Sequence, residues 1–262
     1  MKKSIKKVAL VLTMILAVSC LFGCGKKNEN EFVVGFDAEF PPYGYIGEDG
    51  EYVGFDLDLA QEVCNRRGWT LKKVAIDWNA KDMELESKSI DCIWNGFTMN
   101  GREDDYTWTK PYINNSQVFV VKSGSGIKAQ ADLAGKYVAV QMDSSALAAL
   151  NEEDNADLKA SFKELVEFSD YNTAFMELEM GTVDAVAMDI GVANVQIANR
   201  EAGAYVILDD YLSAEQYGIG FLLGNEELRD KVQETLFEML EDGTLIKIAT
   251  EYDLQDFVCL EK

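Results

Sequence analysis

Short apolar runs alternate with helical patterns along most of this 262-residue chain, and this alternation constrains the fold more than any other feature. The runs are rich in Val, Ile and Tyr, as buried strands are, and they cover residues 32–36, 71–76, 90–94, 136–140, 184–188 and 204–208. The clearest helical pattern repeats Phe55, Leu59 and Val63 at every fourth position and ends at Gly68. The sequence therefore predicts an α/β fold with a largely parallel sheet.

Composition excludes several classes of function. The 46 acidic and 24 basic residues give a formal net charge of -22, which repels phosphate backbones, so we expect no nucleic-acid partner. The chain has no histidine, which excludes Ser-His-Asp triads and His-ligated zinc. The wide spacing of Cys64, Cys92 and Cys259 fits no zinc motif. We therefore expect neither a metal nor a cofactor.

The N-terminus has the pattern of an export signal. Four lysines precede an apolar run at residues 8–18, which is too short to span a membrane. The "LFGC" that follows resembles a bacterial lipobox. We therefore predict a lipoprotein signal peptide over residues 1–23, lipidation of Cys24 by acyl chains such as palmitate, and a polar tether over residues 24–31. A cleaved secretory signal without lipidation is the alternative.

Polar and aromatic residues cluster after five of the predicted strands, where open α/β sheets bind their ligands. In chain order the clusters are Asp37, Glu39 and Phe40; Trp78; Asn95, Gly96, Thr98 and Arg102; Gln141, Asp143, Ser144 and Ser145; and Asp189. Each residue also has a purely structural interpretation. Asp143, Ser144 or Ser145 can cap the helix that follows, Asp189 can cap a helix at residues 191–199, and Trp78 can belong to the core. Recurrence at five strand ends favours a binding site.

The chain resembles the amino-acid-binding members of the type II periplasmic binding protein superfamily, the solute receptors of ABC importers, over residues 31–262. The resemblance rests on the order and spacing of "VGFDAEFPPYGY", "GEYVGFDLDLAQEV", "DCIWNGFT" with a following arginine, "TAFMELEMGTVDAVAMD", "EQYGIGF" and "LEDGTL". It implies two α/β lobes joined by a two-stranded hinge, with a ligand cleft between them. The first lobe is expected at 32–118 and 219–262 and the second at 119–218, with crossings near Val118–Lys122 and Gln216–Phe221.

The resemblance also implies roles for the candidate residues. Arg102 would hold the ligand carboxylate with backbone N–H groups near Thr98 and Ser145, and Asp189 would hold the ammonium with the Gly96 carbonyl. Phe40 and Trp78 would flank the ligand side chain and Asp37 would meet its polar tip, while Asn95, Gln141 and Ser144 would complete the site. One departure concerns Arg102, which follows Thr98 by four residues where relatives usually have five. Because Arg102 keeps the family's distance to the following "YTWTKPY", we expect a compact loop rather than a lost clamp.

These features together predict an extracytoplasmic, lipid-anchored and monomeric protein. It would bind a free amino acid, preferably one with a cationic or amide side chain, close its lobes and deliver the ligand to the permease of an ABC importer. A sensory ligand-binding protein is one alternative. An enzyme on the same fold is another, with Glu39 or Asp37 as its acid or base. We expect a receptor rather than an enzyme and no catalytic residue.

Overall fold

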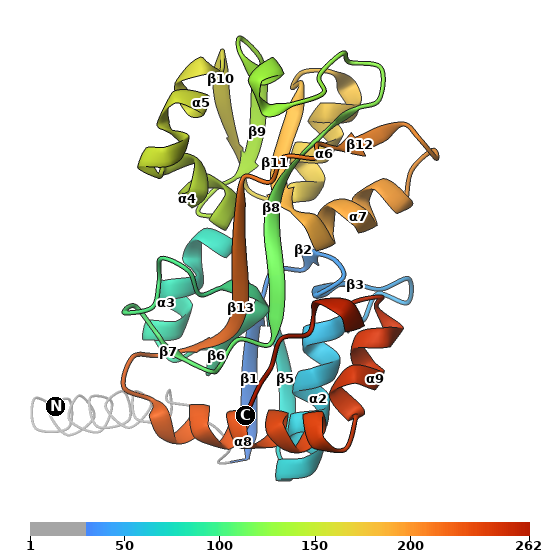
Figure 1. Ribbon diagram of the computed structural model, residues 1–262. Coiled ribbons are helices and arrows are strands. Elements are labelled where there is room, and N and C mark those ends of the chain that lie inside the picture. Colours follow the sequence, from blue (N-terminus) through green and yellow to red (C-terminus); the bar gives the residue numbers. More distant parts are fainter. Residues whose placement is uncertain (1–29) are drawn as a thin grey trace, which may run out of the picture. The chain divides into compact units, whose positions relative to one another are not determined.

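The computed structural model describes residues 30–262, of which Phe32–Lys262 form one compact unit (Figure 1). The predicted signal peptide, Cys24 and the tether up to residue 29 lie outside the described residues. None of the helices in residues 30–262 has the length and apolar composition needed to cross a bilayer.

A first group of elements lies in the lower part of Figure 1. Its main strands are β1 (Glu31–Phe36), β5 (Thr70–Ala75), β6 (Cys92–Thr98) and the short β7 (Thr107–Trp108), and β1 and β6 run parallel. Its helices are α2 (Phe55–Arg67), α3 (Lys81–Glu86), α8 (Glu226–Glu241) and α9 (Thr244–Glu251). A small antiparallel sheet of β2 (Glu39–Phe40), β3 (Gly44–Ile46) and β4 (Tyr52–Val53) lies beside them. The α2 helix ends at Gly68 in the left-handed conformation, as the sequence predicts.

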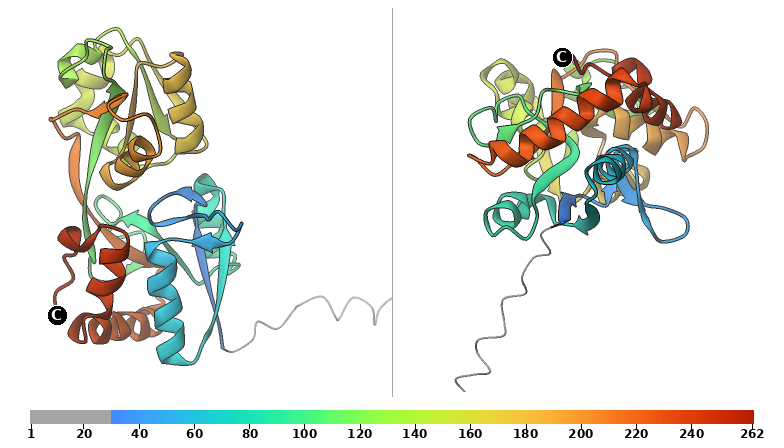
Figure 2. Two further views of the ribbon diagram at one scale, coloured as in Figure 1. Left: turned by 90° about the vertical axis from the view of Figure 1, so that its right-hand side faces the viewer. Right: turned by 90° about the horizontal axis from the view of Figure 1, so that it is seen from below.

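A second group of elements lies above the first, and the left view of Figure 2 separates the two groups clearly. Its strands are β9 (Tyr137–Gln141), β10 (Glu164–Phe168), β11 (Ala185–Asp189) and β12 (Tyr205–Ile207). Its helices are α4 (Ser145–Asn151), α5 (Ala156–Ser161), α6 (Tyr171–Met180) and α7 (Ile190–Ala198). One of its hydrophobic clusters is built from residues between Phe119 and Leu212, including Leu133, Val140 and Ala187.

Two long strands, β8 (Ile113–Lys122) and β13 (Ser213–Phe221), connect the groups. They pair antiparallel at the centre of the main sheet, whose order within residues 30–262 is β10-β9-β11-β8-β13-β6-β1-β5. The two crossings expected from the resemblance fall within these strands. Because β13 also pairs with β6 and β8 also pairs with β11, the strands β11, β8, β13 and β6 lie side by side at the centre of the sheet.

The main correction to the sequence analysis concerns the bounds of the third predicted strand. We predicted it at residues 90–94, with Asn95, Gly96 and Thr98 after its end, whereas β6 continues to Thr98 and contains all three. The strand continues because β13 pairs with it as far as the Tyr217–Thr98 position, and because its polar side chains find buried partners. The Asn95 side-chain oxygen Oδ1 accepts from the Asp37 backbone N–H at 2.8 Å. The sequence analysis also missed β10 entirely.

Candidate functional site

A small cavity lies between the two groups of elements. Eight residues line it, all of them candidates from the sequence: Phe40, Trp78, Asn95, Gly96, Gln141, Ser144, Ser145 and Asp189. The Asn95 side-chain nitrogen is buried and has no hydrogen-bond partner among the described residues.

Strand register places Asp189 in a polar cluster at the cavity wall. The pairing of β11 with β8 sets Asp189 opposite Gln117, and the Asn115 and Gln117 amides each donate to Asp189 Oδ1 at 2.8 Å. The Tyr217 hydroxyl donates to the same oxygen. Asp189 is only 4% exposed, and this burial raises the pKa of its carboxyl group. Asp189 precedes α7 but makes no side-chain capping bond, so the capping interpretation is wrong.

A second buried carboxylate, Glu215, joins this cluster, and the sequence analysis missed it. Glu215 Oε1 accepts from the Asn115 amide at 2.6 Å, from the Gln117 amide at 2.7 Å and from the Thr98 hydroxyl at 2.9 Å. Burial, and then the charge of Asp189, raise the pKa of Glu215 to about 8. Glu215 precedes the buried Tyr217 by two residues on β13, and residues two apart on a strand share a face. This spacing was the sequence signal that Glu215 would be buried.

Neither carboxylate has a cation beside it within residues 30–262. The ion pairs of this part of the chain all involve other acids. Buried charges are normally paired, and the amide and hydroxyl donors around Asp189 and Glu215 supply dipoles rather than charge. The cluster can therefore bind a cationic group, and Asp189 presents it to the cavity.

Arg102 lies beside the cavity and contacts the wall residue Ser145 despite its shortened turn. The turn closes by a hydrogen bond of 2.9 Å from the Arg102 N–H to the Met99 carbonyl. Arg102 Nη1 then donates to Ser145 Oγ at 3.1 Å and to the Thr98 carbonyl at 3.2 Å, and its guanidinium lies 5.4 Å from the centroid of the Phe97 ring. No carboxylate in residues 30–262 pairs with Arg102, so its charge is available to an anion.

Asp37 lies beside the cavity rather than in its wall. One oxygen accepts from the Glu39 N–H at 2.8 Å, which forms a turn within the chain. The other accepts from the Gln141 amide at 2.7 Å, which joins the first group of elements to the second. Burial is the main cause that raises the pKa of Asp37. Asp37 therefore closes this turn and lies next to the cavity at the same time.

Gly96 occupies a position that only glycine fits well. Its φ is +55°, and an added Cβ would lie 2.9 Å from the Tyr217 ring and 3.0 Å from the Phe40 ring. Its N–H donates to the buried Asp56, whose pKa burial raises to about 7. The Gly96 backbone is thus held rigidly against the cavity.

Trp78 and Ser144 combine structural contacts with a place in the wall. Ser144 accepts from the Leu147 N–H at 3.2 Å and so caps α4, as its structural interpretation predicted. The Trp78 ring packs edge-on against Phe97, and its Nε1 donates to the Asp143 carbonyl at 3.2 Å. The Asp143 side chain does not cap a helix; it pairs with Lys81, a 2% exposed residue that the sequence analysis missed.

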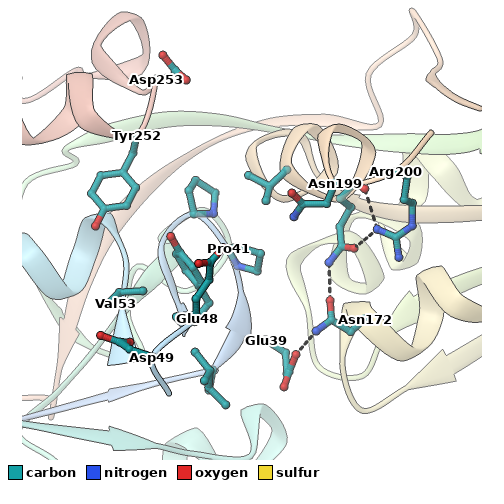
Figure 3. Close-up of a pocket in the computed structure, with 17 residues that line it drawn as sticks. Glu39, Pro41, Glu48, Asp49, Val53, Asn172, Asn199, Arg200, Tyr252 and Asp253 are labelled. Carbon is teal, nitrogen blue, oxygen red and sulfur yellow. Dashed lines mark hydrogen bonds between the residues drawn. The ribbon is translucent and has the colours of Figure 1, made fainter. Parts of the chain in front are cut away.

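A second, larger groove of about 1020 Å³ lies at the edge of the β2–β4 sheet (Figure 3). Across it, Asn172 donates to Glu39 and accepts from Gln196, which in turn accepts from Arg200. Arg200 already pairs with Glu179. The groove therefore offers no unpaired positive charge from this network, and we place the candidate site in the smaller cavity. Within residues 30–262 no group of three acidic or cysteine side chains is arranged to hold a metal ion.

Comparisons with known proteins agree on one family. Residues 32–255 match the family model "Bacterial extracellular solute-binding proteins, family 3". The chain is 27% identical to the L-cystine-binding protein TcyJ of Escherichia coli (strain K12) over 229 residues, which cover 86% of this chain and 84% of the relative.

Solved structures give the same result. A substrate-binding protein of an ABC uptake transporter from Streptococcus pneumoniae, with bound histidine, has a TM-score of 0.84 at 30% identity and covers 88% of this chain and 95% of its own. An ancestral arginine-binding protein bound to arginine has a TM-score of 0.79 at 34% identity, with 86% and 98% covered. The predicted two-lobe α/β fold class is therefore confirmed.

The same comparisons decide between receptor and enzyme. The matched family and the named relatives are binding proteins, which confirms the prediction of a receptor rather than an enzyme. Because the family model covers most of the sequence, the chain belongs to the bacterial extracellular solute-binding proteins, family 3.

Proposed function

We propose that this protein binds a free α-amino acid and delivers it to the permease of an ABC importer. The observation that carries the proposal is a pair of unmatched charges at one cavity. Within residues 30–262, Asp189, with Glu215 behind it, lies in the cavity wall without a cation beside it, and Arg102 contacts the wall residue Ser145 and pairs with no carboxylate.

An α-amino acid carries the two complementary charges on neighbouring atoms. Its ammonium would meet Asp189 and its carboxylate would meet the Arg102 guanidinium, so that both protein charges gain a charge-assisted partner. Neither a simple amine nor a simple acid would satisfy both ends. The names of the relatives, which include receptors for cystine, histidine and arginine, support the same class of ligand.

The ligand side chain would extend between Phe40 and Trp78. Asp37 and Gln141 lie next to this part of the cavity and offer carbonyl and carboxylate oxygens. These groups favour a side chain with N–H donors, either cationic or amide, and the negative charge of Asp37 disfavours an acidic side chain such as that of glutamate.

Calorimetric titration with a panel of L-amino acids tests the proposal. The best ligand is then compared with its N-acetyl and its α-carboxamide derivatives, which each lack one of the two charges. Both derivatives should bind much more weakly than the parent amino acid. No binding by any amino acid, or equal binding by the derivatives, would contradict the proposed function.

Replacing Asp37 by asparagine is expected to reduce affinity for arginine or lysine at least tenfold and to affect glutamine less. A lost charge-assisted hydrogen bond is worth about 1.5–3 kcal/mol, whereas asparagine can still accept a bond from a neutral amide. Titration of both proteins with arginine, lysine and glutamine measures the difference.

Asp49→Asn is the matched control for that experiment, because Asp49 makes the same type of turn bond, to the Glu51 N–H at 3.1 Å, on the exposed surface. Equal losses for all ligands, together with a lower melting temperature of the ligand-free Asp37→Asn protein, would assign Asp37 to the turn alone.

Lipid anchoring through Cys24 is a separate part of the proposal. Its support is the charged N-terminus, the short apolar run and the "LFGC" junction. One acyl chain holds a protein on a membrane only marginally, so a stable anchor implies more than one. The anchor would hold the receptor at the outer side of the cell membrane.

The expected result for Cys24→Ser is loss of lipidation and of membrane association. Full-length protein is expressed in a lipoprotein-competent bacterium and fractionated, and the mature N-terminus is read by mass spectrometry. Cys20→Ser, four residues earlier, is the matched control and should remain lipidated. A wild-type protein that is soluble and begins at another residue would exclude the anchor.

The lobe boundaries and the monomeric state also remain predictions. A cluster drawn only from residues 119–212 is consistent with a second lobe at 119–218. A sensor that binds the same ligand is the alternative function, and neighbouring genes for a permease and an ATPase would favour the importer.

A further inference from the structure

Asp189 and Glu215 compete for the same hydrogen-bond donors. The Asn115 nitrogen donates to Asp189 Oδ1 at 2.8 Å and to Glu215 Oε1 at 2.6 Å, and the Gln117 nitrogen donates to the same two oxygens at 2.8 and 2.7 Å. Two acceptors that share both donors must lie close together. Asp189 is 4% exposed and Glu215 is 6% exposed, so water screens their repulsion poorly.

The groups that face the pair cannot neutralise two negative charges. From the other elements these groups are Thr98, Asn115 and Gln117, and the tyrosines Tyr43, Tyr171 and Tyr217. Burial raises the pKa of each tyrosine well above its usual value, so the phenols stay neutral. No lysine or arginine of residues 30–262 pairs with either carboxylate.

Close, buried carboxylates in this situation usually retain one proton between them. We propose that Asp189 and Glu215 share one proton in the ligand-free protein, and that the ammonium of the bound amino acid displaces this proton into the solvent. The inference rests on the proposed function and deepens it, because it makes Glu215 a second positioning residue for the ligand ammonium.

The charges balance in this exchange. Before binding, the pair carries one proton and one negative charge. The ligand ammonium keeps its own three protons and adds one positive charge, the pair then carries two negative charges, and one proton passes to the buffer. The raised pKa of Glu215, about 8, agrees with a ligand-free pair that holds its proton at neutral pH.

Proton release has a definite sign in the pH dependence of affinity. Below pH 8 the ligand must displace the proton, so the association constant should rise about tenfold for each pH unit between pH 6 and 7. Above pH 8 the pair has already lost the proton and the affinity should level off. Retention of the proton in the complex would instead leave affinity independent of pH.

Calorimetry of the wild-type protein measures the proton directly. L-Arginine, L-glutamine and L-cystine are titrated at pH 6.5 in phosphate and in a second buffer with a much larger ionisation enthalpy, and the difference in heat gives the number of protons released. About one proton should be released for each bound ligand. Binding without proton release overturns the inference and leaves the proposed function intact, whereas no binding by any of the three contradicts the function itself.

Glu215→Gln separates this role from a merely structural one. Glutamine can accept from Thr98 and donate to Asp189 as the protonated acid does, but it cannot titrate. The variant should bind without proton release and with an affinity that is constant between pH 6 and 7. Glu167→Gln, on the exposed side of β10, is the control and should behave as wild type. If Glu215→Gln does not fold, the wild-type proton count still decides the question.

Discussion

Replacement of Arg102 by alanine is expected to weaken amino-acid binding by about 30-fold to several thousand-fold. The guanidinium is held at the cavity by Ser145 and the Thr98 carbonyl and has no carboxylate partner within residues 30–262. In the complex its loss would leave a buried carboxylate without its main charge, which costs about 2–5 kcal/mol by analogy with interfacial charge pairs. Calorimetric titration of both proteins measures the loss.

Two controls make the Arg102 result specific. Arg66 pairs with Glu62 on α2 and with Asp242 just after α8, away from the cavity. The Arg66→Ala variant should therefore bind amino acids with wild-type affinity. Arg102→Lys keeps the charge but not the planar guanidinium, so its affinity should lie between those of Arg102→Ala and the wild-type protein. An Arg102→Ala protein with wild-type affinity would show that the short turn does not present this residue to the ligand.

Replacement of Asp189 by asparagine should have an effect of similar size at the other end of the ligand. The change keeps the shape of the side chain and removes the charge that faces the cavity, so the loss is again about 2–5 kcal/mol, or about 30-fold to several thousand-fold in affinity. Glu215 lies behind Asp189 and would retain part of the attraction, which places the expected loss toward the lower end of this range.

The control for Asp189 is Asp209→Asn, an exposed acid in the segment between β12 and β13. Melting of both ligand-free variants is measured in parallel, because asparagine at 189 places an amide beside the Asn115 and Gln117 amides. A large loss of affinity without a large loss of melting temperature assigns Asp189 to the ligand. Unchanged affinity for every amino acid tested would rule out Asp189 as the ammonium partner.

The two predictions depend on residues that sequence reasoning could find. Phe40, Trp78, Gln141, Ser145 and Asp189 lie at or just after the ends of strands, and the alternation of strand and helix alone brings those ends to one edge of a sheet. The order and spacing of the motifs then indicated the family. Most of the cavity wall was therefore predictable from local patterns.

Residues whose position depends on strand pairing could not be found in this way. Glu215 meets Thr98, Asn115 and Gln117 only because β13 pairs with both β6 and β8 in one particular register, and a shift by one residue would turn Glu215 to the other face. The length of β6 and the partners of Asp37 and Lys81 could not be predicted for the same reason, because each depends on contacts between segments far apart in the chain.

The sequence by itself thus indicated the fold class through its periodicity and the family through the order of its short motifs. The resemblance to that family then implied the two charged residues expected to hold an amino acid. The tertiary structure alone decided that Arg102 contacts Ser145, a residue of the cavity wall, across its shortened turn. It also decided that the carboxylate expected to meet the ammonium has a second one, Glu215, beside it. The physical reason is that burial and charge pairing depend on which segments pack together, and only the folded chain brings them into contact.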